Sequence, residues 1–147
     1  MSGYLFPDLS ALCLLAESGR LNELRSSYDS SGRWTAGTAF EVAQSAGRLR
    51  VLAEAGVVDW LGEPIEISDP AEVQRVQFLR RAAFGGDVAD PLGRLGEAET
   101  CHVLSEWGEF AGAIWVTGDA LVQRYAQRRG IRTRQVRRAG SRIGPGG

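Results

Sequence analysis

Apolar residues recur along the chain at strand-like and helix-like spacings, and these spacings predict the order of its elements. Short apolar runs at residues 4–6 and 113–117 are typical of buried strands. Each run is followed within two residues by an aspartate, Asp8 or Asp119, and then by apolar residues at helical spacing that end at a glycine. The order strand, carboxylate, helix is therefore predicted twice, near the beginning of the chain and towards its end.

Two further helices are predicted over residues 38–56 and 95–107, where apolar residues fall on one helical face. A polar, turn-rich stretch at residues 26–37 is predicted to be a loop, and a short strand pair is predicted within residues 57–67. Strands that are separated by helices in this way predict an α/β fold in which helices dominate.

The clearest local signal is the start of a helix at Asp69-Pro70-Ala71-Glu72. It combines an N-cap, a proline at the first helical position and a glutamate at the third, which is the pattern of a capping box. The apolar stripe that follows ends at residues 85–86. Arg80 lies off this stripe and is expected to be solvated. A structural role is predicted for this helix.

The composition of the chain indicates which class of protein it belongs to. The chain has 147 residues, of which 44% are hydrophobic, and this suits one globular domain. It has no apolar run of about 18 residues and no basic leader, so neither a membrane span nor a signal peptide is expected. Cys13 and Cys101 lie in apolar helical patterns and are predicted to be core thiols, which favours the cytoplasm. His102 is the single histidine, and a general-base role for it is disfavoured.

Charge is distributed unevenly along the chain. All 18 acidic residues lie within residues 1–119, whereas residues 120–147 contain eight arginines and no acid. Because a guanidinium binds phosphate through two hydrogen bonds, this end of the chain is predicted to meet a polyanion. The alternative is that these arginines are only solvated and bind no partner. The domain is predicted to cover residues 1–134, and residues 135–147 are expected to form a basic, glycine-rich, disordered tail.

Acidic residues fall at strand ends or in the first turns of helices: Asp8, Glu41, Glu97 or Glu99, and Asp119. The simple interpretation is that each caps a helix or complements its dipole. Two glutamates in one predicted first turn, Glu97 and Glu99, are more than the helix dipole requires. Two carboxylates that lie close together repel each other unless a cation lies between them. Ligand sets made only of oxygen suit Mg²⁺ or Mn²⁺, which support phosphodiester cleavage.

Six segments carry a recognisable pattern when they are taken in order: Asp8-Leu9-Ser10-Ala11-Leu12, Ala39-Phe40-Glu41-Val42, Gly96-Glu97-Ala98-Glu99, Thr117-Gly118-Asp119, Tyr125-Ala126 and Gly130-Ile131. Together they resemble the PIN domain, and the nearest branch is that of the VapC-like toxins of bacterial toxin–antitoxin pairs. The resemblance covers residues 4–133 and implies a three-layer α/β/α fold with a central, mostly parallel sheet. It also implies a Mg²⁺-dependent endoribonuclease, a homodimer, and a cognate antitoxin that covers the acidic site.

The resemblance assigns the acids by position. Asp8, Glu41, Glu97 and Asp119 match the four family acids in order, and the catalytic role is expected for these four. Asp8 and Asp119 are expected to hold the metal most directly, with Glu41 and Glu97 completing the ligand set. Glu99 remains an alternative third ligand.

Contacts with RNA are expected from the end of the second strand and from the following helix. Thr117 supplies a hydroxyl two residues before the fourth acid, and Arg124, Arg128 and Arg129 are candidates to bind the RNA backbone. Trp34 lies in a polar stretch and is the aromatic residue expected to be exposed.

Two other functions remain open. One is a PIN-like module that binds RNA or protein without cleavage. The other is a metal-dependent nuclease that acts on DNA, because backbone contacts from arginine do not separate RNA from DNA. Pro7 interrupts the first strand and Leu9 stands where many family members have threonine, but neither departure removes an acid.

Overall fold

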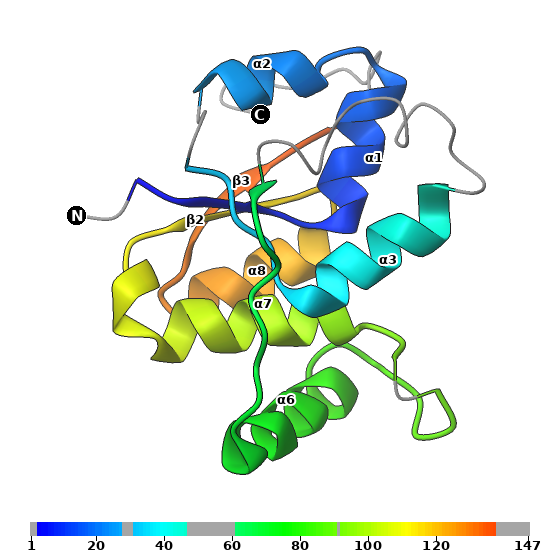
Figure 1. Ribbon diagram of the computed structural model, residues 1–147, viewed down its shortest axis with the longest axis vertical. Coiled ribbons are helices and arrows are strands. Elements are labelled where there is room, and N and C mark those ends of the chain that lie inside the picture. Colours follow the sequence, from blue (N-terminus) through cyan, green and yellow to red (C-terminus); the bar gives the residue numbers. More distant parts are fainter. Residues whose placement is uncertain (1–2, 28–30, 47–60, 91, 138–147) are drawn as a thin grey trace.

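Three parallel strands form the centre of the molecule, in the order β1-β2-β3 (Figure 1). They are β1 (Leu5–Pro7), β2 (Ile114–Thr117) and β3 (Arg132–Gln135). The computed structural model describes residues 3–27, 31–46, 61–90 and 92–137. The predicted α/β class and the parallel sheet are confirmed. β3 was not expected, because its alternate residues are exposed and it has no apolar run.

The sheet continues beyond β1 through single bridges. Leu5 pairs with Gly32, and Thr35 pairs with Ile65, both in parallel. The prediction of a loop over residues 26–37 is therefore wrong in part, because the turn-rich composition conceals a short extended segment. Of the strand pair predicted within residues 57–67, the described residues contain only the bridge at Ile65.

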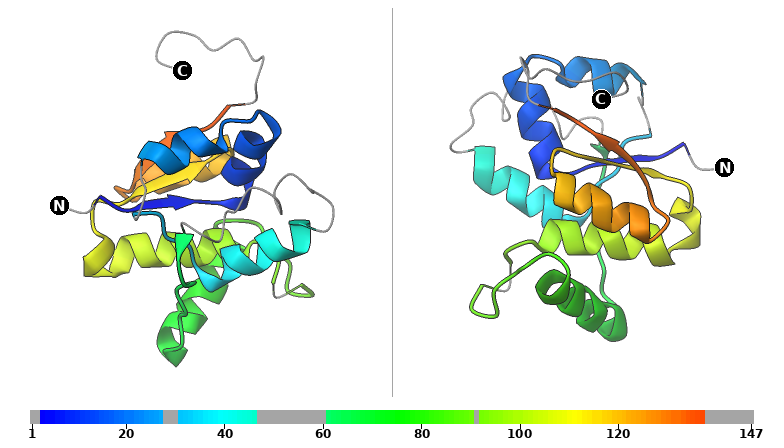
Figure 2. Two further views of the ribbon diagram at one scale, coloured as in Figure 1. Left: turned by 45° about the horizontal axis from the view of Figure 1, so that its top comes forward. Right: turned by 180° about the vertical axis from the view of Figure 1, so that it is seen from behind.

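Helices cover both faces of the sheet (Figure 2, left). Alternate strand residues point to opposite faces: Leu5 and Val116 join the core beneath α1 and α2, whereas Phe6 and Trp115 join the core with α7 and α8. The predicted three-layer arrangement is confirmed. The described helices are α1 (Leu9–Glu17), α2 (Leu21–Ser27), α3 (Ala36–Ala46), α6 (Pro70–Ala82), α7 (Leu95–Glu106) and α8 (Ala120–Arg128), with a short 3₁₀ helix η1 (Gly108–Phe110).

Two of these helices differ from prediction. α2 was not expected as a separate helix. Gly19 has a positive φ of 71° and turns the chain after α1, and a second helix then begins at Leu21. α3 begins two residues earlier than predicted, at Ala36, and the part of that prediction over residues 47–56 lies outside the described residues.

The start of α6 confirms the predicted cap but not the full capping box. The Asp69 carboxylate accepts a hydrogen bond from the Glu72 backbone N–H at 3.1 Å. The Glu72 side chain does not return to Asp69. Its Oε1 instead lies 2.8 Å from His102 Nε2 and 2.7 Å from Trp107 Nε1, so it joins α6 to α7. His102 is buried in this contact, which supports a structural role for it.

Two residues expected in solvent are buried. Arg80 is only 2% exposed, and its guanidinium donates to backbone carbonyls of the loop that follows α6. Trp34 is 3% exposed, and its indole N–H donates to the Gly62 carbonyl at 2.9 Å. Both predictions were wrong for the same reason: a distant segment of backbone covers the side chain, and local sequence does not reveal it.

The end of the fold lies later than predicted. Gln135 belongs to β3 and Val136 is buried in the core, so the tail does not begin at residue 135. Residues 138–147 lie outside the described part. Cys101 is fully buried and Cys13 half-buried, and neither takes part in a disulfide in the described part of the chain. None of the helices in the described ranges has both the length and the apolar character needed to cross a bilayer.

Candidate functional site

The carboxyl ends of β1 and β2 lie side by side, and each strand is followed by an aspartate. Pro7 pairs with Val116 in the parallel register, and the Asp8 N–H donates to the Val116 carbonyl at 3.0 Å. Asp8 and Asp119 therefore reach the same edge of the sheet, where ligand sites of open α/β sheets are found.

Both aspartates cap the helices that they precede. Asp8 Oδ1 accepts from the Ala11 N–H at 3.0 Å, and Asp119 Oδ1 accepts from the Leu121 and Val122 N–H groups at 2.9 and 3.4 Å. The capping interpretation is thus confirmed for both residues. These capping bonds use only Oδ1 of each aspartate. Capping therefore fixes both side chains at this edge of the sheet and leaves the Oδ2 atoms able to bind a ligand.

Four carboxylates line one cavity of about 330 Å³ at this edge. Asp8 and Asp119 enter it from the strand ends, and Glu97 enters from the first turn of α7. Glu41 enters from the middle of α3 and not from its first turn as predicted, because the helix begins at Ala36. We call this cavity the acidic pocket. Its full lining is Asp8, Leu9, Ser10, Cys13, Glu41, Arg94, Glu97, Asp119 and Val122. The structure therefore brings together the four acids that the sequence singled out.

Glu99 is not among the residues that line the acidic pocket. Its Oε1 accepts from the Gly37 N–H at 2.6 Å, at the contact between α3 and α7, and the residue is 9% exposed. Of the two candidate glutamates, Glu97 therefore occupies the pocket, and Glu99 holds the start of α3 against α7.

Glycines allow α3 and α7 to approach closely enough to share the pocket. A Cβ at Gly96 would collide with the Glu41 carboxylate and would lie 2.8 Å from Thr38 Oγ1. A Cβ at Gly37 would lie 2.7 Å from Glu99 Oε1 and 3.1 Å from the Gly96 nitrogen. Larger residues at these two positions would separate the helices and move Glu41 away from Glu97.

Hydroxyl groups connect the two strand ends below the acids. Ser10 Oγ donates to Asp8 Oδ1 at 2.6 Å and accepts from the Gly118 N–H at 2.8 Å. Thr117 Oγ1 lies 3.4 Å from Ser10 Oγ and accepts from the Asp119 N–H at 3.1 Å. Thr117 has no exposed surface, so its predicted contact with RNA is wrong. Its hydroxyl positions the turn that carries Asp119.

Burial and mutual repulsion raise the pKa values of two acids in the pocket. Desolvation raises the pKa of Asp8 from 3.8 to about 6, against the opposing effect of its hydrogen bonds. Desolvation, followed by the charge of Glu97, raises the pKa of Glu41 from 4.5 to about 8. At neutral pH the Glu41 carboxyl is therefore largely protonated, which lowers the repulsion within the pocket.

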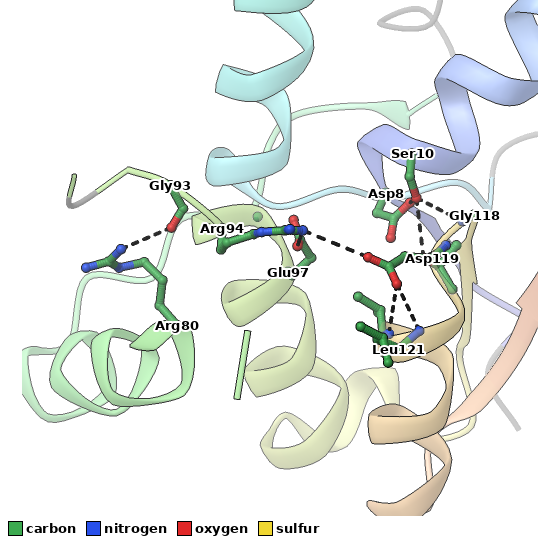
Figure 3. Close-up of polar contacts among 12 residues, drawn as sticks. Asp8, Ser10, Arg80, Gly93, Arg94, Glu97, Gly118, Asp119 and Leu121 are labelled. Carbon is green, nitrogen blue, oxygen red and sulfur yellow. Dashed lines mark hydrogen bonds and ion pairs between the residues drawn. The ribbon is translucent and has the colours of Figure 1, made fainter. Parts of the chain in front are cut away.

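One cation also lines the pocket and was not singled out from the sequence. Arg94 Nη1 lies 2.8 Å from Glu97 Oε2 and 3.9 Å from Asp119 Oδ2 (Figure 3). The Glu97 carboxylate, through its hydrogen bond and its charge, raises the pKa of the Arg94 guanidinium. A lone arginine before a helix carries no recognisable motif, so this contact follows only from the folded chain.

The acids of the pocket suit a divalent cation in chemistry but are not spaced as a ready-made site. Hard carboxylate oxygens are the ligands that Mg²⁺ and Mn²⁺ prefer. Nevertheless, no three of the described His, Cys, Asp and Glu residues form a group able to hold a metal ion. Arg94 lies close to two of the acids, so the negative charge of the pocket is reduced, but not cancelled, by its own arginine and by the proton on Glu41.

The predicted RNA-binding arginines lie on α8 or, for Arg129, at its C-cap, and none of them lines the pocket. Arg124, Arg128 and Arg129 are all exposed. Arg129 lies over the ring of Tyr125, 5.7 Å from its centroid, and lines a second cavity of about 310 Å³ beside His102. Arg128 and Arg129 both lie at the C-terminal end of α8, whereas the pocket residues Asp119 and Val122 lie at its N-terminal end. Exposure is compatible with the predicted contacts of all three arginines.

Comparisons of the chain with protein-family models, with curated proteins and with solved structures give no match. The functional interpretation therefore depends on the geometry of the acidic pocket and on the motifs that resemble the PIN domain.

Proposed function

We propose that this protein is a metal-dependent endoribonuclease that uses the acidic pocket to hold Mg²⁺ or Mn²⁺. The observation that supports the proposal is the convergence of Asp8, Glu41, Glu97 and Asp119 from four elements on one cavity. Helix capping accounts for two of these residues singly, but it does not account for all four in one place.

Each acid has a distinct part in this proposal. Asp8 and Asp119 are held rigidly by their capping bonds and would be the principal ligands. Glu97 would complete the ligand set, and the Glu41 carboxyl would give up its proton as the cation enters, since metal binding and proton release are coupled. When bound, the cation supplies an activated water and neutralises charge on the phosphate.

The resemblance to VapC-like toxins extends the proposal to partners. RNA is the proposed substrate, a cognate antitoxin and a second copy of the chain are the proposed protein partners, and the cytoplasm is the proposed location. The exposed arginines Arg124 and Arg128, placed along α8 away from Asp119, would bind RNA phosphates that extend from the pocket.

RNA cleavage by an Asp119→Asn variant tests the proposal. Asparagine retains the side-chain oxygen that caps α8, so the fold is expected to survive while a charged ligand is lost. We expect Mg²⁺-dependent cleavage of single-stranded RNA by the wild type, abolition by EDTA, and a loss of at least about a hundredfold in the variant. Glu109→Gln, an exposed residue outside the pocket, is the matched control. Equal cleavage by Asp119→Asn and the control would refute the proposal.

The ion pairs of Arg94 favour a second candidate, a non-catalytic module that binds RNA or protein. An arginine that already pairs with Glu97 and Asp119 lowers the need for a metal ion to balance their charge. This candidate predicts RNA binding that is unchanged in EDTA and no cleavage in Mg²⁺. Single-stranded DNA in the same cleavage assay distinguishes an RNase from a DNase.

A further inference from the structure

Arg94 is the cation among the residues that line the acidic pocket, and its position is built into the fold. Its φ is 63°, the one positive value among the described residues other than glycine. A left-handed conformation is unfavourable for a residue with a Cβ, so the surrounding structure must hold it. Arg94 is also the residue before α7, yet its side chain makes no capping bond to that helix. It points instead to Glu97 and Asp119 (Figure 3).

The loop before Arg94 is fixed by the buried guanidinium of Arg80. Arg80 Nη1 donates to the carbonyls of Asp87, Asp90 and Gly93 at 3.0, 2.8 and 3.1 Å. The last of these belongs to the residue directly before Arg94. Arg80 therefore anchors the backbone from which Arg94 reaches into the acidic pocket.

Arg94 contacts carboxylate oxygens that a bound metal ion would also need as ligands. Nη1 lies near Glu97 Oε2 and Asp119 Oδ2, both in carboxylates assigned above as ligands. A guanidinium and a divalent cation repel each other and compete for the same negative charge. The Arg94 side chain is 52% exposed, so it can swing into solvent, and ion pairs this exposed are weak enough to be displaced.

We propose that Arg94 is a built-in counter-ion of the acidic pocket, which leaves when a divalent cation enters and thereby sets the affinity for that cation. The proposal rests on the proposed function, because it takes the same acids as metal ligands. It explains why the pocket collects four acids without the spacing of a ready-made metal site. Arg80 acts through Arg94 as a positioning residue.

Calorimetric titration of Mg²⁺ and Mn²⁺ into the full chain, without RNA, tests the proposal. Arg94→Gln is expected to lower the Kd about three- to tenfold, as removal of two partly exposed ion pairs predicts. Arg132→Gln removes the same charge from β3, outside the pocket, and is expected to change the Kd less than about twofold. Arg94→Lys retains the charge and is expected to lie between the wild type and Arg94→Gln.

The outcomes separate this proposal from the proposed function. If the wild type and Arg94→Gln bind the metal equally, the counter-ion proposal is wrong and the metal site stands. If neither binds, both are wrong. Binding by Arg94→Gln but not by the wild type would support both. An Arg94→Lys variant that binds as tightly as Arg94→Gln would contradict the role of charge. Circular dichroism of each variant verifies that the fold is retained.

Discussion

Substitution of Glu41 by glutamine should change how the stability of the metal-free protein depends on pH. Burial and the charge of Glu97 raise the pKa of Glu41 from 4.5 to about 8. The folded protein therefore retains a proton on Glu41 that the unfolded chain loses above pH 4.5. Since the unfolded state binds fewer protons in this interval, the free energy of unfolding falls as pH rises from 4.5 to about 8.

The size of this effect follows from the pKa shift. While the folded state retains a whole proton, the slope is about 1.4 kcal/mol per pH unit. It becomes smaller as the pH approaches the Glu41 pKa of about 8, and solvent screening of this partly buried side chain reduces the pKa shift itself, so the average slope near neutral pH is roughly 0.5–1 kcal/mol per pH unit. Asp8 contributes in the same direction only below its raised pKa of about 6. Between roughly pH 6.5 and 8, the wild type should therefore lose about 1 kcal/mol relative to Glu41→Gln, or about 2–4 °C in Tm.

Thermal unfolding in EDTA at a series of pH values provides the assay. Glu41→Gln should show a flatter profile than the wild type over this interval, and Glu109→Gln should follow the wild type. Saturating Mg²⁺ should remove the slope in the wild type, because the metal then replaces the proton. Parallel profiles for wild type and Glu41→Gln in EDTA would refute the assignment of a buried, protonated Glu41.

Three other substitutions probe the structure that supports the pocket. Gly96→Ala should lower the free energy of unfolding by about 1–3 kcal/mol in urea, because its Cβ collides with Glu41, and an unchanged midpoint would contradict the close helix contact. Arg80→Met should destabilise the fold by about 2–4 kcal/mol and speed amide hydrogen exchange in residues 87–90 and 92–93, whereas unchanged protection would show that the loop is held otherwise. Ser10→Ala should lower stability by about 1 kcal/mol and weaken Mg²⁺ binding measured by calorimetry; wild-type values of both would exclude its role in joining the strand ends.

The predictable part of the site comes from the ends of two strands. Apolar runs located β1 and β2, and parallel strands necessarily end at one edge, so convergence of Asp8 and Asp119 could be anticipated. The choice between Glu97 and Glu99 also favoured the residue that lines the pocket. The strand ends and the choice of Glu97 depend on the periodicity of apolar residues and on the direction of the chain, and both can be read from the local sequence.

The features that escaped prediction depend on contacts between distant segments. β3 lacks an apolar run, since its pairing with β2 comes from backbone hydrogen bonds rather than from side-chain pattern. Arg80 is buried because a later loop folds its carbonyls onto the guanidinium. Arg94 reaches two acids through a left-handed backbone that no propensity favours. The motifs in the sequence identify the acids of the pocket, but its counter-ion appears only in the folded chain.

The position of bound manganese in a crystal tests the central claim most directly. The metal-site account predicts an anomalous peak in the acidic pocket of Mn²⁺-soaked crystals, about 2.1 Å from carboxylate oxygens of Asp8 and Asp119. It also predicts that the Arg94 side chain has moved away from Glu97. Manganese bound only elsewhere, or a well-ordered pocket that contains no manganese at saturating Mn²⁺ and still holds Arg94 against Glu97, would contradict the account and favour a non-catalytic binding module.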